Sequence, residues 1–256
     1  MPSAAGLTPE QLSSFRERGH LTVPGLLTRA EAAALVEDIH AWGERFLADL
    51  PAGQRAWYVD GGVKARTRTH EVLRKLDNPH RHVPSIEALA ARPALVQWVE
   101  SIIGGGLSLH FSQVFFKPPA GGGPKPAHQD NFYFGPNDLE GLVTAWVALD
   151  DATVDNGCLY FGEGTNRGPV HAHEAPPGEP FNLQLGAEVL ARQPMTPAPV
   201  PLGGVSFHHG NTFHMSGPNH SAHWRRAVAL HYVNAGTRFV RPALPYDESL
   251  RLRVSE

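Results

Sequence analysis

A run of three glycines, Gly104-Gly105-Gly106, divides the chain into two parts with different hydrophobic patterns. Before this run, apolar residues recur every three or four positions, which is the spacing of one face of a helix. After it, short segments rich in β-branched and aromatic residues are separated by Gly, Pro and Asn turns. This order predicts a mainly β protein, an antiparallel barrel or jelly roll with the earlier helices packed outside it.

The expected helices are marked by their start signals. Thr8-Pro9-Glu10-Gln11 forms a capping box with proline at the first helical position, and this helix should end at Gly19. A short strand is expected at 20–23. A second capping box, Thr28 to Glu31, predicts a longer helix, and segment 85–103 predicts one or two more.

The expected strands share an alternating or β-branched composition. They are 107–116, 143–149, 158–161, 204–207 and 227–233. Segment 118–127 is a glycine-proline loop. Segment 163–201 carries eight prolines and is long enough to be a mobile cover over an active site. We expect residues 1–256 to form one domain, with a helical part at about 8–103 packed on a jelly roll at about 107–234.

Composition excludes several classes of protein. The formal net charge of -3 and a pI near 6.6 give no basic footprint for nucleic acid. One cysteine, Cys158, excludes an internal disulfide and fits a reducing compartment. No apolar run approaches the roughly eighteen residues that a membrane helix needs, and the first residues lack the apolar region of a secretory signal. We therefore expect a cytoplasmic protein that binds neither nucleic acid nor a membrane.

Three of the residues that could bind a metal stand out among 15 histidines and 25 acidic residues. His128 and Asp130 are two residues apart, so on an extended chain they project from one face and could share a metal ion. His214 is followed, eleven residues on, by Arg225. Two histidines and one carboxylate leave three coordination positions open, as in non-haem Fe(II) oxygenases, and an arginine supplies a fork for a carboxylate. Taken alone, the His-x-Asp pair could equally be two solvated loop residues.

Further motifs accompany these residues in order from about residue 7 to about residue 234. They are Leu7-Thr8-Pro9-Glu10-Gln11 with Gly19, Val23-Pro24-Gly25-Leu26-Leu27, Phe116-Lys117-Pro118-Pro119, His128-Gln129-Asp130, Thr144-Ala145-Trp146-Val147-Ala148-Leu149, Asn156-Gly157-Cys158-Leu159, Gly164-Thr165-Asn166-Arg167-Gly168, and finally His214, Ser216, Asn219, Ser221 and Arg225. In these motifs the chain resembles the phytanoyl-CoA dioxygenase family of Fe(II)/2-oxoglutarate-dependent oxygenases.

The resemblance implies a fold and a set of site residues. The implied fold is a double-stranded β-helix, a cupin-like jelly roll with the metal near one open end. The implied iron ligands are His128, Asp130 and His214. The implied 2-oxoglutarate pocket consists of Arg225, Ser216, Trp146, Gln113 and Lys75. Read from the sequence alone, Trp146 could instead be ordinary core packing of a strand.

The resemblance also implies an activity. It is that of a dioxygenase that uses Fe(II), 2-oxoglutarate and O2 to hydroxylate an unactivated C–H bond of a small organic molecule, with release of succinate and CO2. We expect a bacterial specialised metabolite, as in antibiotic biosynthesis. The same chemistry could give ring closure, epimerisation or desaturation, or act on a fatty acyl-CoA. Halogenation is disfavoured, because a halide site requires the loss of the metal-binding carboxylate and Asp130 is present. From another class, a non-catalytic jelly-roll binding module is the alternative.

Arg225 and Arg226 are adjacent, so only one of them can point into the barrel. An inward Arg225 takes alanines and His231 with it, whereas an inward Arg226 takes the larger Val228, Leu230 and Tyr232. A cosubstrate pocket needs small neighbours, and the spacing of the family also selects Arg225. We therefore predict that Arg225 points inward and Arg226 outward.

Other histidines are not expected to bind the metal. His208 and His209 are adjacent on a strand and point to opposite faces, so at most one could face it. His171 and His173 lie in the proline-rich segment, where solvated loop residues are the default.

Substrate identity depends on segments 54–69, 132–138 and 163–201. We expect Phe132, His220 and His223 to contact the substrate. A modest basic stretch, which could face acyl-CoA phosphates or simply solvent, consists of Lys64, Arg66, Arg68, Arg74 and Lys75. The expected partner is a small molecule, and the chain is expected to be a monomer or homodimer.

Overall fold

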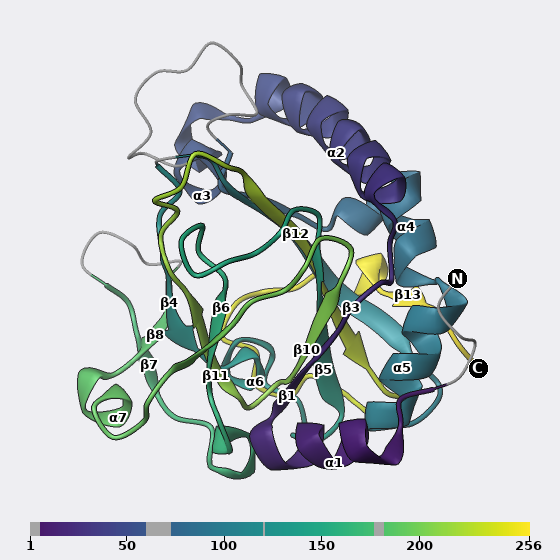
Figure 1. The fold of residues 1–256 in the computed structure, drawn as a ribbon, viewed down its shortest axis with the longest axis vertical. Helices are drawn as coiled ribbons and strands as arrows, with labels where there is room; N and C mark the ends of the chain where they lie inside the picture. Colours follow the sequence, from purple (N-terminus) through teal and green to yellow (C-terminus); the bar gives the residue numbers. More distant parts are fainter. Residues whose placement is uncertain (1–5, 60–72, 120, 177–181) are drawn as a thin grey trace.

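The first helices begin where the capping boxes predict. Residues 6–59, 73–119, 121–176 and 182–256 are described by the structure, a computed structural model (Figure 1). Helices α1 (Pro9–Arg18) and α2 (Arg29–Asp49) each have a threonine N-cap with both hydrogen bonds of the capping box. Gly19 ends α1 with a φ of 79°, a left-handed conformation that glycine adopts without steric cost.

Two further helices complete the helical part that was predicted. Segment 85–103 forms α4 (Pro84–Ala90) and α5 (Pro93–Ile103), and each has a proline in its first turn. The shorter α-helices are α3 (Arg55–Tyr58), α6 (Asp130–Phe134) and α7 (Ala187–Leu190). The 3₁₀ helices are η1 (Ala52–Gln54), η3 (Pro79–Arg81), η4 (Thr165–Arg167) and η5 (Glu248–Leu250).

The larger sheet has seven strands and only antiparallel pairings, in the order β1-β10-β5-β12-β3-β13, with β2 also paired to β3. Its strands are β1 (His20–Val23), β2 (Lys75–Asp77), β3 (Ser108–Lys117), β5 (Leu142–Ala148), β10 (Val205–His209), β12 (Arg225–Val233) and β13 (Leu252–Arg253). Neighbouring strands come from distant parts of the sequence, which is the connectivity of a jelly roll and not of a simple meander.

The smaller sheet is also antiparallel and has the order β4-β11-β6-β9. Its strands are β4 (Lys125–His128), β6 (Leu159–Gly162), β9 (Thr196–Ala198) and β11 (Phe213–Ser216). A separate two-stranded ribbon is formed by β7 (His173–Glu174) and β8 (Gln184–Leu185). Strand β4 includes the last residues of segment 118–127, which was predicted to be a glycine-proline loop.

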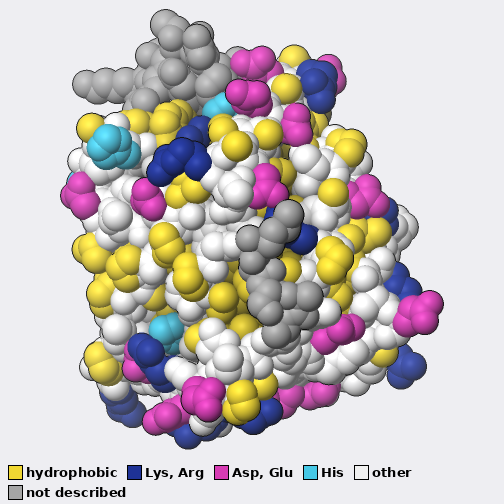
Figure 2. Space-filling view, turned by 45° about the vertical axis from the view of Figure 1, so that its right-hand side comes forward, with side chains coloured by type: hydrophobic (Ala, Val, Ile, Leu, Met, Phe, Trp, Pro, Cys, Tyr) yellow, Lys and Arg dark blue, Asp and Glu magenta, His cyan; other side chains and the backbone are white. Residues whose placement is uncertain are grey.

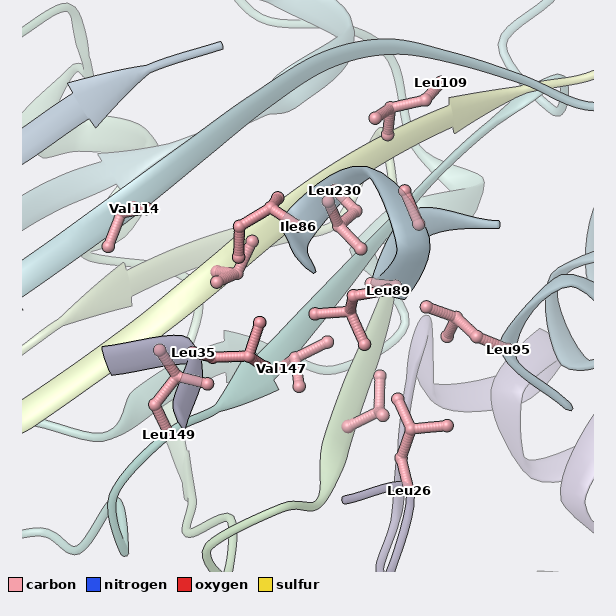
Figure 3. Close-up of a cluster of buried hydrophobic side chains, with 14 of the residues drawn as sticks. Leu26, Leu35, Ile86, Leu89, Leu95, Leu109, Val114, Val147, Leu149 and Leu230 are labelled. Atoms are coloured by element: carbon pink, nitrogen blue, oxygen red, sulfur yellow. The ribbon is translucent and has the colours of Figure 1, made fainter. Parts of the chain in front are cut away.

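One face of the larger sheet is covered by helices α2, α4 and α5 (Figure 1). Figure 3 shows the side chains that meet there. Those from the helices are Leu35, Ile86, Leu89 and Leu95, and those from the sheet are Leu109, Val114, Val147 and Leu230. Full burial of each such side chain stabilises the fold by about 1.5–3 kcal/mol, so the helices hold this sheet as a rigid wall.

The other face of the larger sheet packs against the smaller sheet. Side chains from both sheets form one buried cluster of Trp146, Ala148, Ala227, Ala229, Leu159, Phe161 and Ala198. This packing of two antiparallel sheets with jelly-roll connectivity confirms the predicted fold class. Several members of the cluster are alanines, whose small side chains leave space between the sheets.

The proline-rich segment 163–201 is more than the cover that was predicted. Its last part forms strand β9, which pairs with β6 at the edge of the smaller sheet. Pro197 is tolerated in β9 because a proline cannot donate a ladder hydrogen bond and is therefore confined to edge strands. The earlier part contributes η4, β7, β8 and α7, so the interpretation of the whole segment as a cover is wrong for β9.

The surface carries charges of both signs. On the face shown in Figure 2, Lys and Arg side chains lie among Asp and Glu side chains, in keeping with the small net charge of the chain. Within the described residues, none of the helices is long and apolar enough to cross a bilayer.

Candidate active site

A cavity of about 1090 Å³ lies between the two sheets, against the inner face of the larger one. Because successive residues of a strand point to opposite faces, residues paired across neighbouring strands form rows on this face. One row consists of His208, Thr144, His231 and Phe111. The next row consists of Trp146, Ala229, Gln113 and Asp77. The wall of the cavity therefore combines polar and aromatic side chains.

The three predicted metal ligands meet at one end of the smaller sheet. His128, the last residue of β4, pairs in register with His214 of β11. Asp130 is the first residue of α6, so the chain is extended only through Gln129 and then turns into a helix. The Nε2 atoms of His128 and His214 lie 3.8 and 3.6 Å from Asp130 Oδ1. One ligand atom of each residue lies within 4.8 Å of the others, an arrangement that can hold a single metal ion.

Both imidazoles are held in the tautomer that a metal needs. Nδ1 of His128 donates to the carbonyl oxygen of Pro126 at 2.8 Å, and Nδ1 of His214 donates to that of Thr212 at 3.1 Å. Each bond leaves the lone pair of Nε2 free to bind a metal. Burial lowers the pKa of His128 well below its ordinary value, and burial with the neighbouring His208 lowers the pKa of His214 to about 3. Both rings are therefore neutral and ready to bind a metal at physiological pH.

The second oxygen of Asp130 is held by residues of the larger sheet. Thr144 Oγ1 donates to Oδ2 at 2.6 Å, and His208 Nε2 lies 3.2 Å from the same atom. His231 Nδ1 lies 2.8 Å from Thr144 Oγ1. Burial alone would raise the pKa of Asp130, but the imidazoles of His214, His231 and His208 outweigh it and hold the pKa well below its ordinary value. The carboxylate is therefore ionised, with Oδ1 turned toward the two ligand histidines.

Removing either donor behind Asp130 should weaken metal binding. We expect Thr144→Val and His208→Leu each to reduce the affinity for Fe(II) or Co(II) by about 10- to 100-fold, because partners of a ligating carboxylate set its orientation and charge. The measurement is an anaerobic metal titration. Ser206→Ala is the matched control, since Ser206 lies on β10 with His208 and its buried hydroxyl has no partner among the described residues. Equal affinity in all four proteins would contradict this role.

The guanidinium of Arg225 is buried at the same cavity. Arg225 is 2% exposed, and its Nε and Nη1 have no hydrogen-bond partner in the described part of the chain. Its Cζ lies 5.4 Å from the ring centroid of Trp146. Burial lowers the pKa of Arg225 to about 9, so the group still carries its charge at neutral pH. A buried cation with unused donors is suited to bind a carboxylate.

The predicted register of this strand is confirmed. Arg226 points the other way, where it forms a bidentate pair with Asp150 at 2.7 Å through Nε and Nη2. Ala229 and His231 line the cavity together with Arg225. Val228, Leu230 and Tyr232 instead pack into the core beneath the helices, on the same face as Arg226.

The other predicted pocket residues also line the cavity. Ser216 of β11 is buried there. Gln113 Nε2 donates to Asp77 Oδ1 at 2.7 Å, and Lys75 Nζ pairs with Asp77 Oδ2 at 2.9 Å. Lys75 and Gln113 are thus joined through Asp77, which sequence reasoning did not select. The alternation of Lys75 and Asp77 on one strand could have indicated it.

The three predicted substrate contacts, Phe132, His220 and His223, do not line the cavity. Helix α6 turns by about 100° per residue, so Asp130 shares a face with Tyr133 and Phe134, which line the cavity. Phe132 points elsewhere and stacks on His173 at 4.0 Å. His220 and His223 are exposed and do not line the cavity. Asn219 fastens their loop to the last residue of β3, because its Nδ2 donates to the carbonyl oxygens of Lys117 and His223.

The remaining histidines have structural partners. His209 pairs with Glu140 at 3.3 Å on the face opposite to His208. His173 is not a solvated loop residue, since its Nε2 accepts from the backbone N–H of Gln129 at 3.0 Å. This bond fixes the loop between the two ligands of β4 and α6. The basic residues at 64, 66 and 68, and residues 60–69 of the predicted substrate segment, lie outside the described residues.

Comparisons with known proteins agree on one family. A sequence model of the phytanoyl-CoA dioxygenase family matches residues 15–227. The chain is 27% identical over 237 residues to a probable alpha-ketoglutarate-dependent hypophosphite dioxygenase of Stutzerimonas stutzeri, which covers 88% of this chain and 78% of that protein. It is 28% identical over 275 residues to phytanoyl-CoA dioxygenase domain-containing protein 1 of Mus musculus, with 90% and 91% covered.

A solved structure shares the fold. It is a non-heme alpha-ketoglutarate-dependent carbocyclase from nogalamycin biosynthesis, with a TM-score of 0.72, 22% sequence identity and 97% of each chain covered. At this identity the likeness supports the architecture of the chain and not its substrate.

Proposed function

The chain belongs to the phytanoyl-CoA dioxygenase family and is therefore a non-haem, Fe(II)- and 2-oxoglutarate-dependent oxygenase; we propose that it hydroxylates an unactivated C–H bond of a small organic molecule. Succinate and CO2 are the co-products. The observation that carries this proposal is the buried His128–Asp130–His214 set in one cavity with the guanidinium of Arg225, whose Nε and Nη1 have no partner among the described residues.

The donor atoms fit the groups that the proposal requires. His128, Asp130 and His214 would hold Fe(II) and leave positions open for a 2-oxo acid and O2. Arg225 would bind the distal carboxylate of 2-oxoglutarate, with Ser216 beside it. When bound, iron with 2-oxoglutarate and O2 supplies the oxidation of the C–H bond.

The residues of the chain position the reactants and exclude water. Thr144 and His208 hold Oδ2 of Asp130, which leaves Oδ1 for the metal. Trp146 packs beside Arg225 and shapes the cosubstrate pocket, and Gln113 lies in the same row of the sheet. Lys75 would act indirectly, by pairing with Asp77. The burial of the ligands keeps bulk water away from the reacting centre.

We infer that the substrate is of metabolite size. A cavity of about 1090 Å³ is slightly larger than the usual range for small-molecule sites, about 300–1,000 Å³. It is much larger than the hypophosphite ion named for the Stutzerimonas stutzeri relative. A bacterial specialised metabolite agrees with this size, and so does the acyl part of a fatty acyl-CoA. Because a carbocyclase shares this fold, ring closure is the second candidate reaction.

Coupled product analysis tests the function. The purified protein with Fe(II), 2-oxoglutarate, ascorbate and a panel of bacterial metabolites should release succinate and give one product heavier by one oxygen atom. A product lighter by two hydrogens would indicate ring closure or desaturation, and one of unchanged mass would indicate epimerisation. Absence of 2-oxoglutarate binding and of succinate under every condition would favour a non-catalytic binding module.

A further inference from the structure

The chain after β12, residues 234–256, forms one wall of the cavity, and we call it the C-terminal segment. Residues 244–247 of this segment line the cavity together with the strands that carry the polar rows. The segment lies beyond residues 15–227, which the family model matches. The match to the family model therefore assigns no role to this segment.

Hydrogen bonds fasten the C-terminal segment before and after residues 244–247. Before them, the backbone N–H of Val240 donates to the carbonyl oxygen of Gly135 and that of Ala243 donates to the carbonyl oxygen of Tyr133, both at 2.9 Å. After them, His80 and Arg81 each donate to the carbonyl oxygen of Leu250 at 2.8 Å. Strand β13 then pairs with β3. Residues 244–247 are thus anchored at both ends where they line the cavity.

Tyr246 is the aromatic residue among the four residues 244–247 that line the cavity. Its ring packs against Phe134 at 4.9 Å, Phe111 at 5.3 Å and His110 at 5.4 Å between centroids. These contacts fix the ring. In the described part of the chain, the Tyr246 hydroxyl has no hydrogen-bond partner.

Tyr246 lines the same cavity as Asp130 and the Lys75–Asp77 pair. Burial raises the pKa of the Tyr246 hydroxyl, and the carboxylates of Asp130 and Asp77 raise it further. The hydroxyl remains protonated at neutral pH and can donate a hydrogen bond.

We propose that Tyr246 is a specificity-determining residue whose hydroxyl donates a hydrogen bond to a carbonyl or hydroxyl oxygen of a ring-shaped, mainly apolar substrate. This inference rests on the proposed function, because it names the substrate class of the same cavity. Aromatic rings bind flat apolar rings through stacked and edge contacts, and Phe111, Phe134 and Tyr246 supply three rings that line the same cavity as Asp130. A fixed phenol without a protein partner adds one directed polar contact.

Matched ring compounds test the proposal without knowledge of the natural substrate. The probes are 9-fluorenone and fluorene, and 1-indanone and indane, since in each pair the ketone has a carbonyl group where the hydrocarbon has a CH2 group. Their affinities are measured by equilibrium dialysis against the full-length protein loaded with Ni(II) and 2-oxoglutarate. Wild-type protein should bind each ketone about 2- to 10-fold more tightly than its hydrocarbon partner, the ratio expected for one neutral hydrogen bond.

Tyr246→Phe should remove this preference by weakening only the ketones. The affinities for the hydrocarbons and for 2-oxoglutarate should not change, which separates a lost contact from a damaged fold. Tyr160→Phe is the matched control, because Tyr160 lies on β6 and does not line the cavity, and it should behave as wild type. Equal binding of ketone and hydrocarbon by wild type, or an unchanged preference in Tyr246→Phe, would overturn the proposal.

The two proposals can fail separately. If the protein binds no 2-oxoglutarate and releases no succinate, the proposed function fails. The ketone and hydrocarbon comparison is then repeated on the metal-free protein, where a preference lost in Tyr246→Phe still supports the role of Tyr246 and its absence overturns it.

Discussion

Alanine in place of His128, Asp130 or His214 is expected to abolish 2-oxoglutarate turnover. Each change removes one of the three donors that lie within 4.8 Å of one another. Changes behind a metal ligand already cost about 10- to 100-fold in affinity, so loss of a ligand should weaken Fe(II) binding by more than about 100-fold. The measurements are an anaerobic Fe(II) titration and succinate release followed by NMR.

Stability has to be separated from metal binding in this experiment. Asp130→Ala leaves Thr144 and His208 without their acceptor, and an unsatisfied buried polar group costs about 1–3 kcal/mol. Asp130→Asn keeps the shape and one oxygen, so thermal unfolding of the two variants shows how much of the effect is structural. Asp150→Asn, outside the cavity, should bind Fe(II) as wild type does. Turnover retained by Asp130→Ala would exclude the role proposed for that carboxylate.

A related variant tests the disfavoured halogenase activity. Asp130→Gly opens a coordination position, and with added chloride it should give no chlorinated product. The reason is that an open position does not itself place a substrate carbon for transfer of the halide. Detection of a chlorinated product by mass spectrometry would show that the cavity already supports halogenation.

Arg225→Ala should weaken the affinity for 2-oxoglutarate by about 30-fold to several thousand-fold. Removing one partner of a buried, hydrogen-bonded charge pair costs about 2–5 kcal/mol, and each 1.4 kcal/mol corresponds to about tenfold. The variant should remain folded, because Nε and Nη1 of Arg225 have no partner to lose among the described residues. Calorimetric titration of 2-oxoglutarate into the Ni(II)-loaded protein gives the affinity directly.

Two variants complete the test of Arg225. Arg226→Ala should change the affinity little, since Arg226 pairs with Asp150 on the opposite face. Arg225→Lys should recover only part of the affinity, because an ammonium lacks the planar fork that binds a carboxylate through two parallel bonds. A large loss in Arg226→Ala with a small loss in Arg225→Ala would reverse the assignment of the cosubstrate site.

Much of this protein could be predicted from patterns that depend on near neighbours. The capping boxes at Thr8 and Thr28 locate the first two helices, because a cap is made by residues three positions apart. The alternation of strand residues determines that Arg225 points opposite to Arg226. The predicted ligand motif also places His128 and Asp130 close together.

The contacts that depend on packing between distant segments could not be predicted in this way. His208 was expected only to avoid the metal, yet it holds Asp130 across 78 residues of sequence. Phe132 was expected at the substrate, but the turn at Asp130 into helix α6 directs Tyr133 and Phe134 there instead. His220 and His223 were misplaced because side-chain bonds of Asn219 hold their loop outside.

The sequence by itself determined the main helices, most strands of the larger sheet, the family and the candidate ligands, since these depend on local spacing and on residue chemistry. The tertiary structure alone decided the short strands such as β4 and β9 and what surrounds those ligands. It joined β10, β5, β12 and β3 into one row of His208, Thr144, His231 and Phe111, and it brought Tyr246 of the C-terminal segment to the lining of the cavity. The reason is physical: strand pairing and the burial of apolar faces set which distant side chains meet, and this depends on the whole chain and not on any one motif.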